Sequence, residues 1–294
     1  MMYGINNIKQ IISSGDVNLI RRRLGMVFDF DCNGFPNETD GQVLYYAQHE
    51  LRKISKDLEL ELMFNRFYKD SASRYEKYTA SNMVGIGSAE FLMGIDGKSK
   101  KYLGEEPQHI VRLSSFEVGK TVVTRELYHL YDSSYCVGDE PNMPATDISW
   151  FDAVMFAAWI DCRLLTEAEW EYACRGGSST DWCCETENEL KHYAWYSNSS
   201  NGYVRPVGLL KPNQFGLYDM HGNVWEWCLD GYEERYYDKS PEHNPVNNKD
   251  RLDKVCRGGS MHAFAEMCRS SFRHSEPPDF KAGDIGFRLA RTKI

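Results

Sequence analysis

Apolar residues recur at helical spacing through the first 86 residues of the chain. Three stripes have the three-to-four spacing of an amphipathic helix: Ile5, Ile8 and Ile12, then Val17, Ile20, Leu24 and Val27, then Leu44, Ala47, Leu51, Ile54, Leu58 and Leu62. Such a stripe must pack on another surface. We therefore expect residues 1–86 to form a helical segment that caps the following domain, or that mediates self-association or partner docking.

The pattern changes after a polar stretch from Ser71 to Ser88, so we place the domain boundary there and expect a second unit over 87–294. Residues 110–113 and 116–124 are typical of strands. Ser149 and Asp152 have the spacing of a capping box, as do Thr166 and Glu169, and each pair predicts the start of a helix. Gly176-Gly177 predicts the end of the second helix. Few other regular elements are indicated, and the fold class is α+β and loop-rich.

The composition of the chain argues against several classes of protein. The 294 residues carry a net charge of −9, and no basic stripe of the kind that binds nucleic acid is present. No apolar run approaches the length of a membrane span, and the N-terminus lacks a signal-peptide pattern. The nine cysteines do not form the paired CxxC spacing of a zinc site. We therefore expect a cytoplasmic protein with mostly reduced thiols and no nucleic-acid or membrane partner.

One short loop in the N-terminal segment has the ligand spacing of an EF-hand. Acidic and amide side chains stand at the first, third, fifth and twelfth positions, with Gly34 at the sixth: Asp29, Asp31, Asn33 and Asp40. Pro36 and the short Asp40 depart from the usual pattern. The loop is either a calcium site or an Asx-rich turn between helices.

The larger unit carries a series of motifs and lacks the signatures of phosphate-loop, nucleophile-elbow and zinc-protease enzymes. The motifs follow in order: Phe91-Leu-Met-Gly94, Pro144 to Trp150, Arg163 to Ala173, Tyr193-Ala-Trp-Tyr196, Gly216-Leu-Tyr-Asp219, Gly222-Asn-Val-Trp-Glu-Trp227, Arg257-Gly-Gly-Ser260, Cys268 to Arg273 and Gly286-Phe-Arg288. This constellation resembles the formylglycine-generating enzyme family of sulfatase-modifying factor domains. The resemblance implies a C-type-lectin-like fold with two helices and small antiparallel sheets.

The family contains several functional classes. Its copper-dependent oxidases, which convert a sulfatase cysteine to formylglycine, hold copper(I) with two thiolates three and eight residues after the serine of Arg-Gly-Gly-Ser. Those positions are Ala263 and Cys268 here. Counted back from Gly286, Cys268 instead belongs to a strand shared with members that lack the pair. Cys268 is therefore the catalytic candidate only if the oxidase alternative holds, and copper is not expected. The non-haem iron class takes several histidines from a helical N-terminal domain. Residues 1–86 contain one histidine, His49, which is too few to form such an iron site.

A third class uses the fold as a binding platform and includes the variable proteins of diversity-generating retroelements. This class is our expectation: a non-catalytic module that binds a protein or other ligand, either with a diversified C-terminal surface or as an undiversified accessory domain. Aromatic, Met and polar side chains that alternate with framework residues near the C-terminus would supply the contact area. The expected surface is His262, Phe264, Glu266, Met267, Phe272, His274, Glu276 and Phe280.

The resemblance also implies a calcium site built from two carboxylates and two backbone carbonyls: Asp219, Gly222, Val224 and Glu226. Glu226 is alternatively a buried carboxylate held by backbone N–H groups. A second family site needs Asn where Trp195 stands. Five arginines are interpreted as structural partners of the glutamates at 167, 169 and 171, with an anion pocket as the alternative: Arg163, Arg257, Arg269, Arg273 and Arg288. Cys183 and Cys184 are either a redox pair or free thiols in a loop.

Overall fold

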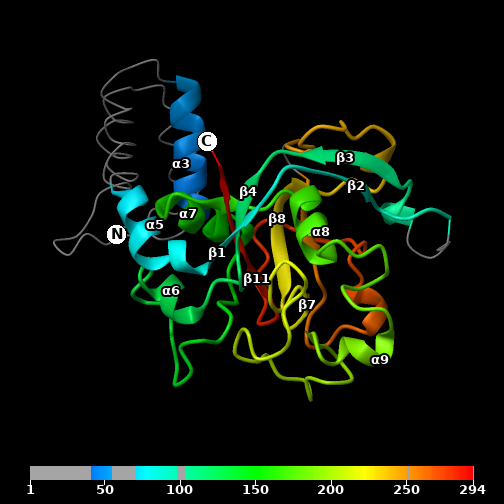
Figure 1. Cartoon of the computed structure of the whole chain (residues 1–294). Helices are drawn as coiled ribbons and strands as arrows, with labels where there is room; N and C mark the ends of the chain where they lie inside the picture. Colours follow the sequence, from blue (N-terminus) through cyan, green and yellow to red (C-terminus); the bar gives the residue numbers. More distant parts are fainter. Residues whose placement is uncertain (1–40, 55–69, 98–102, 250–251, 294) are drawn as a thin grey trace.

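The computed structural model describes residues 41–54, 70–97, 103–249 and 252–293 (Figure 1). Helices and short strands are joined by long ordered loops, as the α+β, loop-rich expectation required. Figure 1 shows α3, α5 and α6 at one end of the molecule, and the β2–β3 ribbon and α9 at the other. The EF-hand-like loop with Asp29, Asp31, Asn33 and Asp40, and the first two predicted helices, lie outside the described residues.

Two four-stranded sheets form the centre. The first has the order β1-β4-β12-β5 and is antiparallel throughout. Its strands are β1 (Met83–Ile86), β4 (Phe116–Gly119), β12 (Leu289–Thr292) and β5 (Arg163–Leu164). The second has the order β10-β9-β8-β11, in which β11 runs parallel to β8. Its strands are β10 (His274–Glu276), β9 (Lys254–Arg257), β8 (Trp225–Gly231) and β11 (Ile285–Phe287).

The other described strands form two two-stranded sheets. β2 (Ala89–Met93) pairs with β3 (His109–Leu113), and the two-residue β6 (Ala194–Trp195) pairs with β7 (His221–Gly222). Shorter helices punctuate the loops: α5 (Ser71–Tyr78), α6 (Arg125–His129) and α9 (Glu187–Leu190), with 3-10 turns η2 (Ala80–Asn82), η3 (Leu103–Glu105), η4 (Tyr236–Asp238) and η5 (Ala265–Cys268).

Both predicted capping boxes are present. Ser149 and Asp152 cap α7 (Trp150–Trp159), and Thr166 and Glu169 cap α8 (Glu167–Arg175). The backbone N–H of Asp152 donates to the Ser149 hydroxyl at 3.2 Å, and the acid accepts the Ser149 N–H in return. α8 ends at Gly176, whose φ of 57° is left-handed and suits glycine. These caps fix where each helix begins, and so fix which side chains of α8 point into the interior.

The N-terminal helix α3 (Gly41–Ile54) packs on α7. Leu44 and Ala47 are fully buried, and the Gly41 N–H donates to the Asp152 carboxylate at 2.7 Å. The apolar stripe of this helix is therefore covered by the domain over residues 41–47, which supports the cap interpretation. β1 ends at Ile86 and pairs with β4 in the first sheet, and the boundary expected between residues 86 and 87 stays a prediction. Among the described residues, no helix has the length and apolar character needed to span a bilayer.

Candidate functional site

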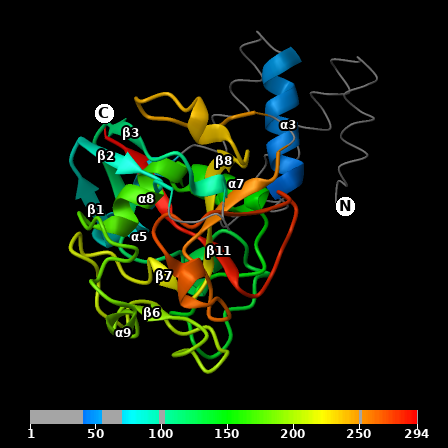
Figure 2. The ribbon, with the colours of Figure 1, turned by 90° about the vertical axis from the view of Figure 1, so that its right-hand side faces the viewer.

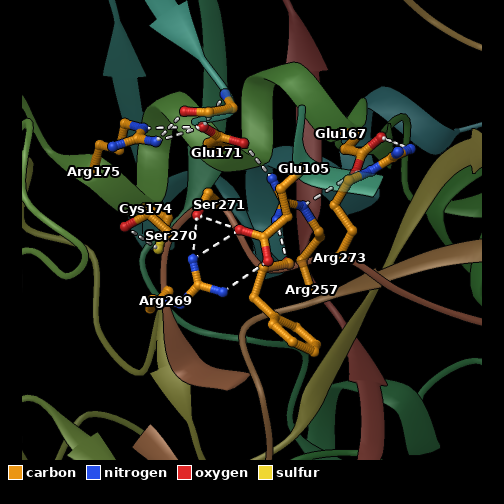
Figure 3. A network of polar contacts seen from close by, with 12 residues as sticks. Glu105, Glu167, Glu171, Cys174, Arg175, Arg257, Arg269, Ser270, Ser271 and Arg273 are labelled. Atoms are coloured by element: carbon orange, nitrogen blue, oxygen red, sulfur yellow. Dashed lines mark hydrogen bonds and ion pairs between the residues drawn. The ribbon is translucent and has the colours of Figure 1, made fainter. Parts of the chain in front are cut away.

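The segment from Arg257 to Arg273 joins β9 to β10 and has a buried side and an exposed side. On the buried side, Arg257 donates to Glu171 on α8 and to the carbonyl of Phe272 (Figure 3). Its Nε lies 3.3 Å from Glu167. Burial alone would raise the pKa of Glu171, but the guanidinium groups of Arg175 and Arg257 lower it below the usual value. The carboxylate is therefore ionised and holds the start of the segment to α8.

The end of the segment is held in the same way. Arg273 forms a two-pronged pair with Glu167, at 2.6 and 2.9 Å. Arg269 forms another with Glu105 of η3, at 2.8 and 2.7 Å, and the Ser271 hydroxyl donates to the same carboxylate. Figure 3 shows these groups converging between α8 and the segment. The planar fork of arginine matches a carboxylate in this geometry, which supports the structural interpretation of these side chains.

The remaining two predicted arginines are also paired. Arg163 contacts Glu169 at 2.6 and 2.7 Å, and Arg288 contacts Glu226 at 2.7 Å. The sequence pattern missed Glu105 and Glu226 as arginine partners. Neither is near its arginine in the chain, so no local spacing could have found them. In this arrangement all five arginines have carboxylate partners, which favours a structural role over an anion pocket.

On the exposed side, alternate residues face outward. His262, Phe264 and Glu266 are exposed, and the Phe264 side chain is 66% exposed. Between them Met261, Ala263 and Ala265 are buried. η5 lies on the right-hand side of Figure 1 and faces the viewer in Figure 2. The backbone therefore presents three predicted ligand-binding side chains from a segment whose alternate residues are anchored in the interior.

The other predicted surface residues are placed differently. Phe280 is 39% exposed, and Met267, His274 and Glu276 are half-buried. Phe272 is a correction: it is only 7% exposed, and its ring packs 6.1 Å from that of Trp225. The ring follows a buried arginine and two buried serines in the chain. Its transfer from water to the interior is favourable because it removes a large apolar surface from solvent. Phe272 is therefore part of the support and not of the exposed face.

One exposed aromatic residue was missed. Tyr203 is 68% exposed and ends a loop whose backbone is pinned to the segment. The Ser197 N–H donates to the Ala263 carbonyl at 3.0 Å, and the Ser200 hydroxyl donates to the Met261 carbonyl at 2.7 Å. A run of Tyr, Ser, Asn and Gly over 196–203 was the signal that could have found it, because binding loops favour this composition.

The two copper positions of the family's oxidases lie side by side, but only one carries a thiol. A side-chain carbon placed on Gly259 would stand 2.6 Å from the Cys268 sulfur and 3.2 Å from the Ala263 methyl. The methyl group therefore occupies the side on which a second thiolate would stand. Cys268 is fully buried, and burial raises the pKa of its thiol to about 12. These residues do not fit a two-thiolate copper(I) site, since such a site needs two sulfurs and only Cys268 supplies one.

Of the two carboxylates in the implied calcium site, Asp219 fits a hard cation and Glu226 is paired with other side chains. Asp219 is buried, one of its oxygens accepts the Gly208 N–H at 2.8 Å, and the other has no partner in the described part of the chain. Burial raises the pKa of Asp219 to about 6. An unpaired buried carboxylate oxygen fits a hard cation. Glu226, in contrast, accepts from Arg288 and from Trp170 Nε1, so its partners are side chains and not the expected backbone N–H groups.

Trp195, which stands where the second family calcium site would need Asn, packs against an arginine. The Arg205 guanidinium lies 5.4 Å from the centre of the Trp195 ring and donates to the Ser200 carbonyl at 2.8 Å. This contact ties the Tyr203 loop to β6 without a metal ligand set.

Cys183 and Cys184 are buried free thiols, and burial raises their pKa values to about 12 and about 11. The buried His221 accepts the Cys183 N–H through Nε2 at 3.1 Å, and its Nδ1 lies 2.7 Å from the Cys268 carbonyl. Burial lowers the pKa of His221 to about 4, so the ring is neutral at pH 7. The imidazole therefore acts as a bridge between two loops. In the described ranges, no group of three or more His, Cys, Asp or Glu side chains could hold a metal ion.

Comparison with known proteins agrees with this fold. The family model of the sulfatase-modifying factor enzyme 1-like domain matches residues 68–293. The formylglycine-generating enzyme of Streptomyces coelicolor is 36% identical over 169 residues, which cover 51% of this chain and 53% of that enzyme. A serine/threonine-protein kinase, pkn1 of Chlamydia caviae, is 34% identical over 243 residues, which cover 72% of this chain and 38% of the kinase. The chain spans about half or less of the length of these relatives.

Two solved structures resemble the chain over most of their own length. Variable protein 1 of Treponema denticola is 28% identical with a TM-score of 0.62, and the match covers 71% of this chain and 94% of that protein. PvdO from Pseudomonas aeruginosa is 27% identical with a TM-score of 0.64, over 71% and 93%. The chain belongs to the sulfatase-modifying factor enzyme 1-like family, and its fold is the C-type-lectin-like fold of formylglycine-generating enzymes.

Proposed function

We propose that this chain is a non-catalytic binding module whose ligand, a protein, is held by the exposed side of the 257–273 segment. The observation that carries the proposal is the contrast at Ala263 and Cys268. The fold brings the two copper positions together and provides one buried thiol beside a methyl group. The same segment presents His262, Phe264 and Glu266 outward on a backbone that buried ion pairs hold rigid.

A rigid backbone with exposed side chains suits recognition, because little conformational entropy is lost when the partner binds. Aromatic side chains supply contact area at low entropic cost, and polar neighbours set orientation. The name of the Treponema relative, a variable protein, supports use of this scaffold with an altered surface. A reverse transcriptase gene beside a near-copy of the codons for residues 257–288 would establish the diversified form of the proposal. Its absence would favour an undiversified accessory domain.

The alternative function is a copper-dependent formylglycine-generating oxidase, and the identity to the Streptomyces enzyme favours it. The two proposals separate in one assay. The full chain is loaded with copper(I) and incubated with a peptide of the form Cys-x-Pro-x-Arg, and formylglycine is measured by mass. We expect none. Formation of the aldehyde at a rate that scales with bound copper would overturn the binding-module proposal.

A substitution at position 263 tests the interpretation of the copper site by a second measurement, the affinity for copper(I). Ala263→Cys places a second thiol beside Cys268, and we expect this variant to bind copper(I) more tightly than the wild type by at least tenfold, since a soft ion prefers two thiolates. Ala265→Cys is the matched control, because Ala265 is also buried in this segment but is not a family copper position. Equal copper(I) affinity for the wild type and the Ala263→Cys variant would contradict this interpretation of position 263.

A further inference from the structure

Two loops meet the exposed side of the 257–273 segment, and together with residues 261–267 of the segment they form one face made of three loops. The first is the Tyr203 loop, which is pinned to Met261 and Ala263 as described above. The second leads into α9: Trp182 Nε1 donates to the Ala265 carbonyl at 3.1 Å, and Leu190 of α9 packs in one apolar cluster with Ala263 and Ala265. We define the aromatic–acidic face as Trp182, Glu187, Tyr203, His262, Phe264 and Glu266.

The centre of this face is aromatic. Tyr203 and Phe264 are 68% and 66% exposed, the two highest values among the exposed large hydrophobic side chains of the described residues. A side-chain carbon on Gly202 would stand 3.9 Å from His262 Cε1, so the Tyr203 loop lies directly beside the outward row of the segment. Two exposed rings therefore stand on adjoining loops that are both anchored to the interior.

The rim of the face is acidic. The three loops, over residues 181–192, 197–203 and 261–267, contain five exposed carboxylates and one exposed lysine, Lys191. The carboxylates are Asp181, Glu185, Glu187, Glu189 and Glu266. Glu187 belongs to α9, whose Leu190 lies in the same apolar cluster as Tyr196 and Ala263. Burial, and then the charge of Glu187, raises the pKa of Tyr196. Negative rims steer and orient positively charged partners, and aromatic rings bind cations on their faces.

We propose that the aromatic–acidic face binds a basic segment of another protein, in which Lys or Arg side chains lie over Tyr203 and Phe264 and contact the carboxylates at the rim. This inference rests on the proposed function and adds the chemistry of the partner. An acidic partner would meet like charge at the rim, and a neutral apolar partner would leave those carboxylates without a compensating charge. The combination of rings and carboxylates therefore selects a cationic polypeptide.

The test is a selection of peptides from a random library displayed on phage, with the full chain immobilised. We expect the enriched peptides to be rich in Lys and Arg. As free synthetic peptides they should bind the wild type and should lose affinity by about tenfold or more for the double variant Tyr203→Ser/Phe264→Ser, as expected when central aromatic contacts are truncated. Replacing Lys and Arg by Gln in the peptide should have a similar effect.

A charge-matched control separates this face from general electrostatic attraction. Glu187→Gln/Glu266→Gln and Glu76→Gln/Glu126→Gln remove the same charge, but Glu76 is on α5 and Glu126 is on α6, and these helices lie at the other end of the molecule. The first pair should weaken binding several-fold more than the second. Equal losses would overturn the proposal, since binding would then follow net charge alone.

Two further results of the peptide selection would also overturn part of the proposal. Enriched peptides that require Tyr203 and Phe264 but carry no excess of Lys or Arg would overturn the cationic partner and leave the binding-module proposal standing. If the wild type and the aromatic double variant enriched the same peptides, the face itself would be wrong. The formylglycine assay decides the proposed function independently of either result.

Discussion

The two sides of the 257–273 segment differ in how their residues are held. On the buried side, Arg257, Arg269 and Arg273 each reach a carboxylate from another part of the chain. On the exposed side, Phe264 and His262 project from the same backbone toward solvent. The difference assigns stability to one set of residues and, under the proposed function, recognition to alternate or neighbouring residues of the same segment. Changes on one side should alter folding, and changes on the other should alter binding.

The largest effect is expected from breaking the buried network. Arg257→Met leaves the Phe272 carbonyl without its donor and leaves Glu171 with one guanidinium partner fewer, and removing one partner of a buried pair costs about 3–5 kcal/mol. Urea unfolding measures this loss of unfolding free energy. Arg235→Met is the control, because the pair that Arg235 forms with Asp238 is exposed and should contribute less than about 1 kcal/mol. A loss below that value at Arg257 would abolish the distinction between the two sides.

A second test uses pH. Asp230 is fully buried and accepts the N–H groups of Glu167 and Asn247 at 2.8 and 2.7 Å. Burial, and then the charge of Glu167, raises its pKa to about 7. The folded state therefore holds a proton that the unfolded chain releases near pH 4, so this group's contribution to stability falls as pH rises from about 4 to 7.

We expect the difference in unfolding free energy between the wild type and Asp230→Asn to shrink by a few kcal/mol across that range. Thermal and urea unfolding at pH 4.5, 6 and 8 would measure it on samples matched for ionic strength. A constant difference would mean that Asp230 titrates normally, and that the start of α8 is held by an ordinary ionised carboxylate.

A third test asks how tightly the segment is packed where it turns outward. Gly259→Ala adds a carbon 2.6 Å from the Cys268 sulfur at a φ of 79°. Gly216→Ala is a matched control, because Gly216 has a φ of 80° and nothing within 4 Å of the added carbon. The control should lose about 1–2 kcal/mol from backbone strain, and Gly259→Ala should lose about 1–3 kcal/mol more from overpacking. Equal losses in urea unfolding would show that the sulfur moves aside freely.

Calcium gives a smaller, ligand-dependent effect. If Asp219 holds the ion, a hundredfold excess over Kd should add about 2.7 kcal/mol to stability. The Asp219→Ala variant should lose this gain, whereas Asp181→Ala, an exposed carboxylate elsewhere, should keep it. Calorimetric titration after chelation, with melting temperatures measured alongside, distinguishes the outcomes. A wild type that shows neither heat nor a shift in melting temperature would remove calcium from the site.

The smallest effect on folding is expected on the exposed side. Phe264→Ser should change the unfolding free energy by no more than about 0.5 kcal/mol, as for surface substitutions in general. Phe272→Ser should be costly, because the ring of Phe272 is buried against Trp225. Urea unfolding of both variants checks the contrast. Comparable losses at the two positions would mean that Phe264 is also structural, and would weaken its role in binding.

The sequence predicted those features whose signals are local. The caps of α7 and α8 and the glycine stop after α8 follow from spacing within a few residues, and all three are present. His262, Phe264 and Glu266, which were expected at a binding surface, are exposed, and their role in binding stays a prediction.

Features that depend on distant parts of the chain were not predictable. Glu105 meets Arg269 across 164 residues, and two-residue strands such as β5 and β6 exist only because a remote strand pairs with them. Phe272 was misplaced because a hydrophobic residue beside a recognition segment reads the same whether it faces solvent or the interior. Its neighbour Trp225, which decides the matter, lies far away in the chain.

The contact of α3 with Asp152 has a consequence for how the protein can be shortened. One oxygen of Asp152 accepts the Gly41 N–H, while the other contacts Lys281, which follows Phe280 in the chain. Tyr45 packs on Trp150 and Phe151 beside them. A chain cut at residue 68, where the family match begins, would lose α3 and expose the sides of the Trp150 and Phe151 rings that Tyr45 contacts. The smallest piece worth expressing therefore starts before Gly41, and a shorter one should aggregate even though it contains the whole family domain.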